Sequence, residues 1–165
     1  MKSILILLGI FSTSLAFSQG SMVVVLDGKE WKAKTVSAGI GKIMDMTTFT
    51  ITGRIDKERF DVSVDYNALK GKDSATVTFS QNLMAPPGGA SLSYVPKGLG
   101  KQQWCSASGT LLLSEFDEKA NTASGTFEGS ISQLLDDKGA FILKSPRPTK
   151  SVSGSFEKVH FQSAQ

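Results

Sequence analysis

The stretch "TTFTITGRIDKERFDVSVDY", residues 47–66, decides the fold because apolar and polar side chains alternate through it with a period of two. A strand with one dry and one wet face has this pattern, and it is typical of antiparallel sheet. Asp61, Ser63 and Asp65 belong to the polar set and are expected to face water. The apolar set, expected to face a core, comprises Phe49, Ile51, Ile55, Phe60, Val62, Val64 and Tyr66.

The same alternation continues in "SATVTFS", residues 74–80, where Ala75, Val77 and Phe79 form the apolar set. Turn-forming residues interrupt the pattern at short intervals. These breaks lie at 27–29, 56–58, 70–73, 85–89 and 136–139. We therefore predict an all-β fold, a single antiparallel β-sandwich or barrel-like domain of about nine to ten strands.

Two segments interrupt the strand pattern. The segment 133–136, "QLLD", is expected to form at most a single helical turn. The segment 144–150, "KSPRPTK", is expected to be an exposed, extended loop, because each proline removes a backbone donor and disfavours helix at the residue before it.

The phrase "SGTFEG" at 124–129 returns as "SGSFEK" at 153–158. In each copy a phenylalanine, Phe127 or Phe156, follows a glycine by two positions and so shares its face of the strand. Glycine beside an inward ring leaves room for a neighbouring ring to cross the backbone. We predict neighbouring or directly paired strands with both rings in one core, and the apolar run "AFILKS" between or beside them.

The end of the second copy changes face. After Phe156 the next apolar positions are Val159 and Phe161, which do not continue its alternation. A one-residue change of face is what a β-bulge produces. We predict a bulge near Glu157-Lys158, which leaves His160 pointing to solvent.

Residues 1–18 have the features of an export signal peptide. Lys2 supplies a positive charge, residues 4–10 are apolar apart from a glycine, and "AFS" at 16–18 matches a small-residue cleavage site. The apolar run is shorter than the roughly 20 residues of a membrane span. A buried N-terminal strand or helix is the alternative. The expected mature chain is 19–165, a single exported domain in the periplasm or outside the cell, without a transmembrane span.

Charge and cysteine content narrow the possible partners. Removing Lys2 with the leader takes the 18 basic residues to 17, which against 15 acidic residues leaves a net charge of +2. So small an excess argues against nucleic acid as a partner. The chain has one cysteine, Cys105, so it cannot form an internal disulfide, and no cysteine near the cleavage site could carry a lipid anchor.

Several motifs in sequence order resemble a domain-of-unknown-function family of small exported bacterial proteins, many of them lipoproteins. The resemblance rests on "GKEW" at 28–31, "FTITGRIDKERFDVSVDY", "ASLSYV", "SGTLLLSEFDEKANTASGTFEG" and the closing "VSGSFEKVHF". It implies a β-sandwich or barrel-like domain without an assigned activity, and it supplies no catalytic residues. This chain lacks the lipidation cysteine that many members of the family carry.

Catalytic motifs are sparse. Zinc sites use three or four His, Cys or carboxylate ligands, and the chain has one histidine, His160, and one cysteine. A Cys105–His160 pair could act as nucleophile and base, but Cys105 beside Trp104 is better interpreted as a small semi-buried hydrophobic residue. No G-x-S-x-G elbow accompanies the serines.

Other motifs also favour structural interpretations. The strings "GIGK" at 39–42 and "GLGK" at 98–101 lack the remaining residues of a phosphate-binding loop and are read as turns. The cluster Asp117, Glu118 and Asn121 could bind calcium, but most such acidic clusters are solvated hairpin turns, and that interpretation is favoured. Trp31 is expected in the core rather than as a stacking platform for a sugar.

The run Leu111-Leu112-Leu113 breaks alternation, so one leucine should leave the main core. A barrel cavity for a ligand or an interface would explain it. We expect a non-enzymatic domain, with no catalytic, cofactor or metal residues, that binds a small apolar ligand, a glycan or an envelope protein. The alternatives are a structural or assembly protein docking through a sheet edge or apolar face, and a hydrolase with an unrecognised site.

Overall fold

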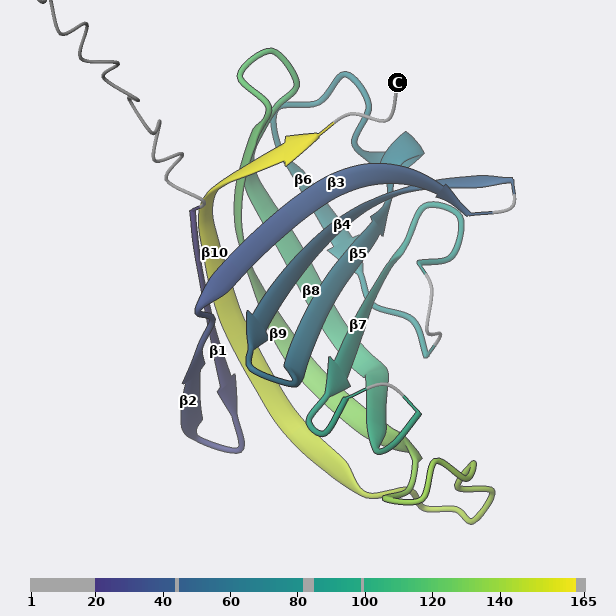
Figure 1. Ribbon diagram of the computed structural model, residues 1–165. Helices are drawn as coiled ribbons and strands as arrows, with labels where there is room; N and C mark the ends of the chain where they lie inside the picture. The colour runs from purple at the N-terminus through teal and green to yellow at the C-terminus, as the bar shows by residue number, and fades with distance from the viewer. Residues whose placement is uncertain (1–19, 44, 82–84, 99, 163–165) are drawn as a thin grey trace, which may run out of the picture.

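The computed structural model describes residues 20–43, 45–81, 85–98 and 100–162, and it confirms the all-β prediction (Figure 1). The described residues form ten strands and one short 3-10 turn, Tyr66–Ala68, which lies between the fifth and sixth strands. The signal peptide predicted for 1–18 lies outside the described residues. The strands are β1 (Ser21–Leu26), β2 (Lys29–Lys32), β3 (Thr35–Ile43), β4 (Met46–Ile55), β5 (Glu58–Asp65), β6 (Ala75–Thr78), β7 (Ala90–Val95), β8 (Gln103–Asp117), β9 (Thr122–Leu135) and β10 (Thr149–Gln162).

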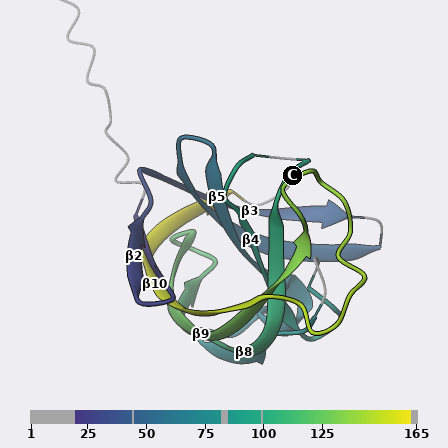
Figure 2. The ribbon, with the colours of Figure 1, turned by 90° about the horizontal axis from the view of Figure 1, so that it is seen from below.

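The strand pairing closes into a ring. Strands β10, β3, β4, β5, β7, β8 and β9 pair in that order, and β9 pairs back onto β10. The β1–β2 hairpin is attached to β10, and β6 is attached to β8. Every pair is antiparallel except β10 with β3, which is parallel at Phe161 and Gln162. Figure 2 shows the strands arranged around a shared interior.

Closure depends on the predicted bulge in β10, which is confirmed. The register of β10 against β9 shifts between Phe156 and Val159, and Lys158 has a φ of 46°. Before the bulge, the other edge of β10 pairs with β1 as far as Glu157, and beyond it the same edge pairs with β3. The bulge therefore lies where β10 exchanges one neighbour for another. His160 is exposed, as predicted.

The two copies of the repeated phrase lie on directly paired strands, β9 and β10. Phe127 lies opposite Gly154, and Phe156 lies opposite Gly125, so each ring faces the glycine of the other copy. A Cβ atom on Gly125 would lie 2.8 Å from Cζ of Phe156, closer than packed side chains allow. Both rings are buried in one core. The repetition is therefore one packing solution used twice, as predicted.

Aromatic side chains fill the middle of the ring from several strands. Phe60 of β5 stacks on Phe127 of β9 with centroids 5.6 Å apart, which joins opposite sides of the interior. Phe49 meets Phe116 and Phe161 edge-on at 5.1 and 5.2 Å. Offset and edge-on arrangements are those that aromatic pairs prefer. The interior is a packed core, with the predicted apolar set of 47–66 buried in it apart from the half-buried Ile55 and Tyr66.

The polar face of β5 is drier than predicted. Asp61 is only 6% exposed and Asp65 only 7%, although both were expected to face water. Arg59 covers Asp61, with its Nε 2.7 Å from Oδ2, and the Thr52 hydroxyl donates to Oδ1 at 2.7 Å. The loop before β7 covers Asp65, which accepts the backbone N–H of Gly88 at 2.7 Å. Neighbouring polar groups thus replace water on this face.

Two local predictions were wrong, and one possible helical turn does not form. The segment 133–136 forms no helical turn, because β9 continues to Leu135, which pairs with Gln103. The "GIGK" string lies inside β3, where Gly39 and Gly41 pair with β4, whereas "GLGK" lies in the β7–β8 loop as expected. The run "AFILKS" is not a strand between β9 and β10, since it makes a single bridge, Leu135 to Phe141.

Candidate functional site

Cys105 and His160 do not form a catalytic pair. Cys105 pairs with Ser132 of β9, and His160 pairs with Thr122 of the same strand. Ten residues of strand separate these partners, a distance of roughly 30 Å. Cys105 is buried, and burial raises the pKa of its thiol, which lowers the thiolate fraction at neutral pH. The geometry supports the structural interpretation of Cys105.

The acidic cluster after β8 is a hydrogen-bonded hairpin turn. Oδ1 of Asp117 accepts the backbone N–H groups of Lys119 and Ala120, both at 2.8 Å, and these bonds lower the pKa of Asp117. Glu118 accepts the hydroxyl of Tyr66 at 2.5 Å. Asn121, with a φ of 54°, ends the turn. Among the described residues, no three His, Cys, Asp or Glu side chains gather as a metal site would need.

Trp31 is buried, as predicted, and its indole forms a hydrogen bond that the sequence did not indicate. Nε1 of Trp31 donates to Oε2 of Glu58 at 2.6 Å. The hydroxyl of Tyr94 lies 3.5 Å from the same oxygen. Burial and the nearby Glu58 carboxylate raise the pKa of Tyr94 to about 12, so this phenol keeps its proton at neutral pH. The hydrogen-bonded side chains of Trp31, Glu58 and Tyr94 connect β2, β5 and β7 at one end of the ring.

The leucine run divides as predicted. Leu111 and Leu113 are fully buried, whereas Leu112 is 46% exposed on the outside of β8. Leu112 belongs to a surface that we call the outer face, formed by outward-pointing residues of four strands. Its residues are Val25 of β1, Ser151 and Ser153 of β10, Thr126 and Glu128 of β9, and Thr110 and Leu112 of β8.

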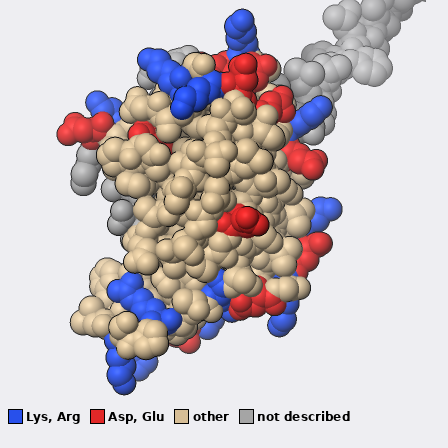
Figure 3. All heavy atoms as spheres, turned by 180° about the vertical axis from the view of Figure 1, so that it is seen from behind, with Lys and Arg blue, Asp and Glu red and all other residues tan. Residues whose placement is uncertain are grey.

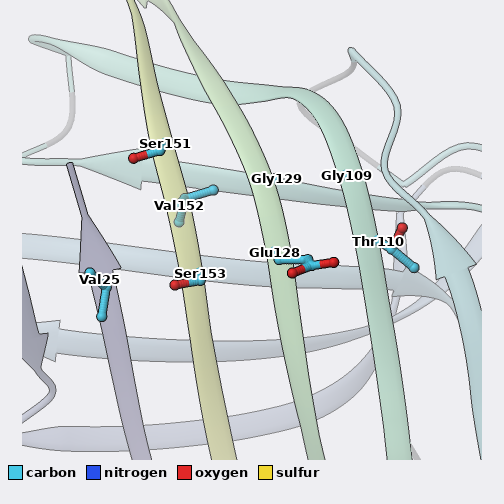
Figure 4. Close-up of a pocket in the computed structure, with 8 residues that line it drawn as sticks. All are labelled: Val25, Gly109, Thr110, Glu128, Gly129, Ser151, Val152 and Ser153. Atoms are coloured by element: carbon cyan, nitrogen blue, oxygen red, sulfur yellow. The ribbon is translucent and has the colours of Figure 1, made fainter. Parts of the chain in front are cut away.

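A shallow depression of about 400 Å³ lies on the outer face (Figure 4). Its floor is the glycine pair Gly109 and Gly129, which lie opposite each other on β8 and β9. A Cβ atom on Gly109 would collide with the backbone of Glu128 and Gly129, and Gly109 has a φ of 132°. Glycine is therefore required for the two strands to approach here. The hydroxyl groups of Thr110, Ser151 and Ser153 border this floor.

Charge is nearly absent from the outer face. Of the described residues that line the depression and its neighbour over Leu112, Glu128 alone is charged. Figure 3 shows this side of the molecule as a broad neutral surface with one acidic group near its middle and the other charges around its margin. The remaining side chains are hydroxylic or apolar. The surface is suited to broad contact rather than to proton transfer.

Sequence reasoning did not identify the outer face as a site. The glycine pair is separated by twenty residues in the chain, so only the β8–β9 register brings it together. The available signal was the alternation of Ser, Thr and Glu in both copies of the repeated phrase, a pattern that an ordinary solvent-exposed strand face also shows. The predicted loop at 144–150 is exposed up to Thr149, as expected.

Comparison with known proteins does not assign the chain to a family. No protein-family model, curated protein or solved structure matches the chain, so the family resemblance in the motifs stays an expectation. Within the described ranges, none of the helical structure has the length and apolar character to cross a bilayer. What is known of the site is therefore its geometry, a neutral and hydroxyl-rich sheet face with Glu128 at its centre.

Proposed function

We propose that this protein is an exported, non-catalytic docking domain that binds another protein on its outer face. The observation that carries the proposal is the neutral surface over β10, β9 and β8, with its single carboxylate at Glu128. Protein interfaces are depleted of charge at their centre, and they need area more than depth. Apart from Glu128, whose charge a partner must match, the residues that line the outer face are uncharged.

The filled interior supports a surface function over an internal ligand. Phe60 stacks on Phe127 across the ring, and Phe49 contacts Phe116 and Phe161. A small apolar ligand would have to displace these rings, which fill the space that a ligand-binding barrel leaves open. The same packing disfavours a catalytic pocket inside the ring.

The composition of the outer face also suits protein contact. Ser151, Ser153, Thr110 and Thr126 have short side chains, so ordering them on binding costs little conformational entropy. Glycans usually require an exposed aromatic platform in addition to hydroxyl groups, and the aromatic residue that lines the outer face, Phe127, is only 3% exposed. Glu128 calls for a basic side chain opposite it in the partner, because a carboxylate buried without one would be costly.

Photo-cross-linking in the native host tests the proposal. A photoreactive residue at Thr126 or Ser153 should give a discrete adduct with one protein, and Glu128→Arg should abolish that adduct. Lys57, in the β4–β5 turn, is the matched control position and should give none. A small molecule retained through purification and released only on unfolding, with no adduct from the outer face, would contradict the proposal and favour ligand binding.

A further inference from the structure

The loop 136–148 between β9 and β10 exposes two large apolar side chains. Phe141 is 67% exposed and Leu143 is 89% exposed, the highest values among the described large hydrophobic residues. The loop projects from the end of the ring opposite the β8–β9 turn, at the lower right of Figure 1. It contributes no residue to the outer face, so its role can be tested separately.

Hydrogen bonds hold this loop in shape and keep the two apolar side chains outside. Oδ1 of Asp136 accepts the backbone N–H groups of Lys138 and Ala140 at 2.8 and 2.9 Å. Ile142 donates to the carbonyl of Leu134 at 2.9 Å, and Arg147 Nε donates to the carbonyl of Ile142 at 3.0 Å. The exposure of the apolar pair is thus a property of an ordered loop rather than of a loose segment.

Positive charge surrounds the apolar pair. The loop carries Lys138, Lys144 and Arg147, all exposed, and the adjacent β7–β8 loop adds Lys97 and Lys101. These five cations outnumber the two carboxylates of the same region, Asp136 and Asp137. Asp137 is paired with Lys97 at 3.0 Å, and Asp136 is engaged by backbone N–H groups. The lobe at the lower left of Figure 3 shows the resulting basic cluster beside uncharged surface.

We propose that this loop inserts Phe141 and Leu143 into the interfacial region of an anionic lipid bilayer, with Lys138, Lys144 and Arg147 against the headgroups. Reversible membrane association generally needs two signals, an inserted apolar group and a basic patch, and the loop supplies both. Long basic side chains can extend their charges to the headgroups while their stems follow the apolar residues inward.

A bilayer is favoured over an acidic protein because of the loop's shape. The apolar pair lies on a projecting lobe, and a rigid protein partner would need a complementary pocket to bury it. A fluid interface accepts a protruding apolar group without a preformed pocket. Charge complementarity then selects a surface with anionic headgroups.

An environment-sensitive fluorophore tests insertion at a defined position. It is attached to Leu143→Cys in the full chain, with Lys119→Cys in the β8–β9 turn at the opposite end of those strands as the matched control. Native Cys105 is buried, so labelling is directed to the introduced thiol. Vesicles contain phosphatidylcholine alone or mixed with an equal amount of phosphatidylglycerol. Thermal unfolding of each labelled protein checks that it is folded.

We expect the label at position 143 to shift to the blue with phosphatidylglycerol vesicles, and the label at position 119 to stay unchanged. Adding Lys144→Gln and Arg147→Gln should weaken the apparent vesicle affinity by about tenfold or more. Phe141→Ser should also weaken it, and salt should reduce the response.

Three results would overturn the inference. One is a label at 143 that does not respond to phosphatidylglycerol vesicles. Another is an equal response at 143 and 119, which would place insertion elsewhere in the chain. The third is a response at 143 to polyglutamate but not to vesicles, which would identify an acidic protein as the occupant. None of them bears on cross-linking from Thr126 or Ser153, so docking at the outer face can fail or hold independently.

Discussion

The inner and outer sides of β8, β9 and β10 use glycine in opposite ways. On the inner side, Gly125 and Gly154 each make room for a phenylalanine ring of the neighbouring strand. At the Gly109–Gly129 pair no ring enters, and the two backbones approach each other beneath an open depression. The missing side chain makes room for an aromatic ring in the first case and for the backbone of the paired strand in the second. Both pairs of glycines therefore serve packing, and only the Gly109–Gly129 pair lies beneath a surface depression.

The largest effect should come from removing the inner rings. Phe127→Ala and Phe156→Ala should each lower the free energy of unfolding by about 3–5 kcal/mol, because each deletion leaves a cavity in a packed core. Denaturant unfolding with an unchanged slope would measure the loss. A loss below about 1 kcal/mol at either position would mean that the interior can collapse around the missing ring, and the contrast between the two sides would weaken.

Gly109→Ala should lower the free energy of unfolding by about 1–3 kcal/mol, because the new Cβ meets backbone of β9 and the residue must keep a positive φ. Thermal or denaturant unfolding measures the loss, and Ser108→Ala, at the exposed neighbouring position, is the control. A neutral Gly109→Ala would show that the close approach of β8 and β9 is dispensable.

The two inner rings should also be coupled. The Phe127→Ala/Phe156→Ala double variant should depart from additivity by more than about 0.5 kcal/mol, since the residues lie on paired strands in one core. A double-mutant cycle of unfolding free energies measures this coupling. Strict additivity would make the repeated phrase two independent packing sites rather than one shared arrangement.

The smallest effects are expected on the outer face. Leu112→Ser and Glu128→Gln should each change the free energy of unfolding by no more than about 0.5 kcal/mol, because both side chains are exposed and the core does not depend on them. Leu113→Ala, one position away and fully buried, is the contrasting variant and should cost about 2–5 kcal/mol. A large loss from Glu128→Gln would indicate a structural role and count against the docking proposal.

Local pattern was enough to predict an all-β fold and the strands within residues 47–66. Alternation identified the faces of β4 and β5, and the shift from Phe156 to Val159 located the bulge. Both signals arise from nearest neighbours along the chain, because successive strand residues point to opposite faces. The pairing of β9 with β10 was accessible for a related reason, since identical surroundings favour identical phrases.

Long-range contacts determine the structural features that the local sequence pattern could not predict. The residue type of Asp61 and Asp65 predicts exposure to water. Both are buried because Arg59 and the loop at Gly88 cover them. The segment 133–136 stays extended as far as Leu135 because that residue pairs with Gln103, which is distant in the sequence. Ring closure and the outer face depend on register between distant strands in the same way, so neither could be derived from local periodicity.

The order in which β10 gains its neighbours has a consequence for biosynthesis. β10 is the last strand described, yet it supplies hydrogen-bond partners to β1, β9 and β3. During synthesis the N-terminal strands are made first, so the edges of β1, β3 and β9 that pair with β10 stay unpaired until β10 has been made. Unpaired strand edges invite association with other chains. We expect folding to wait for nearly the whole sequence, so that the nascent protein would remain open, and dependent on protection, until its final strand is free.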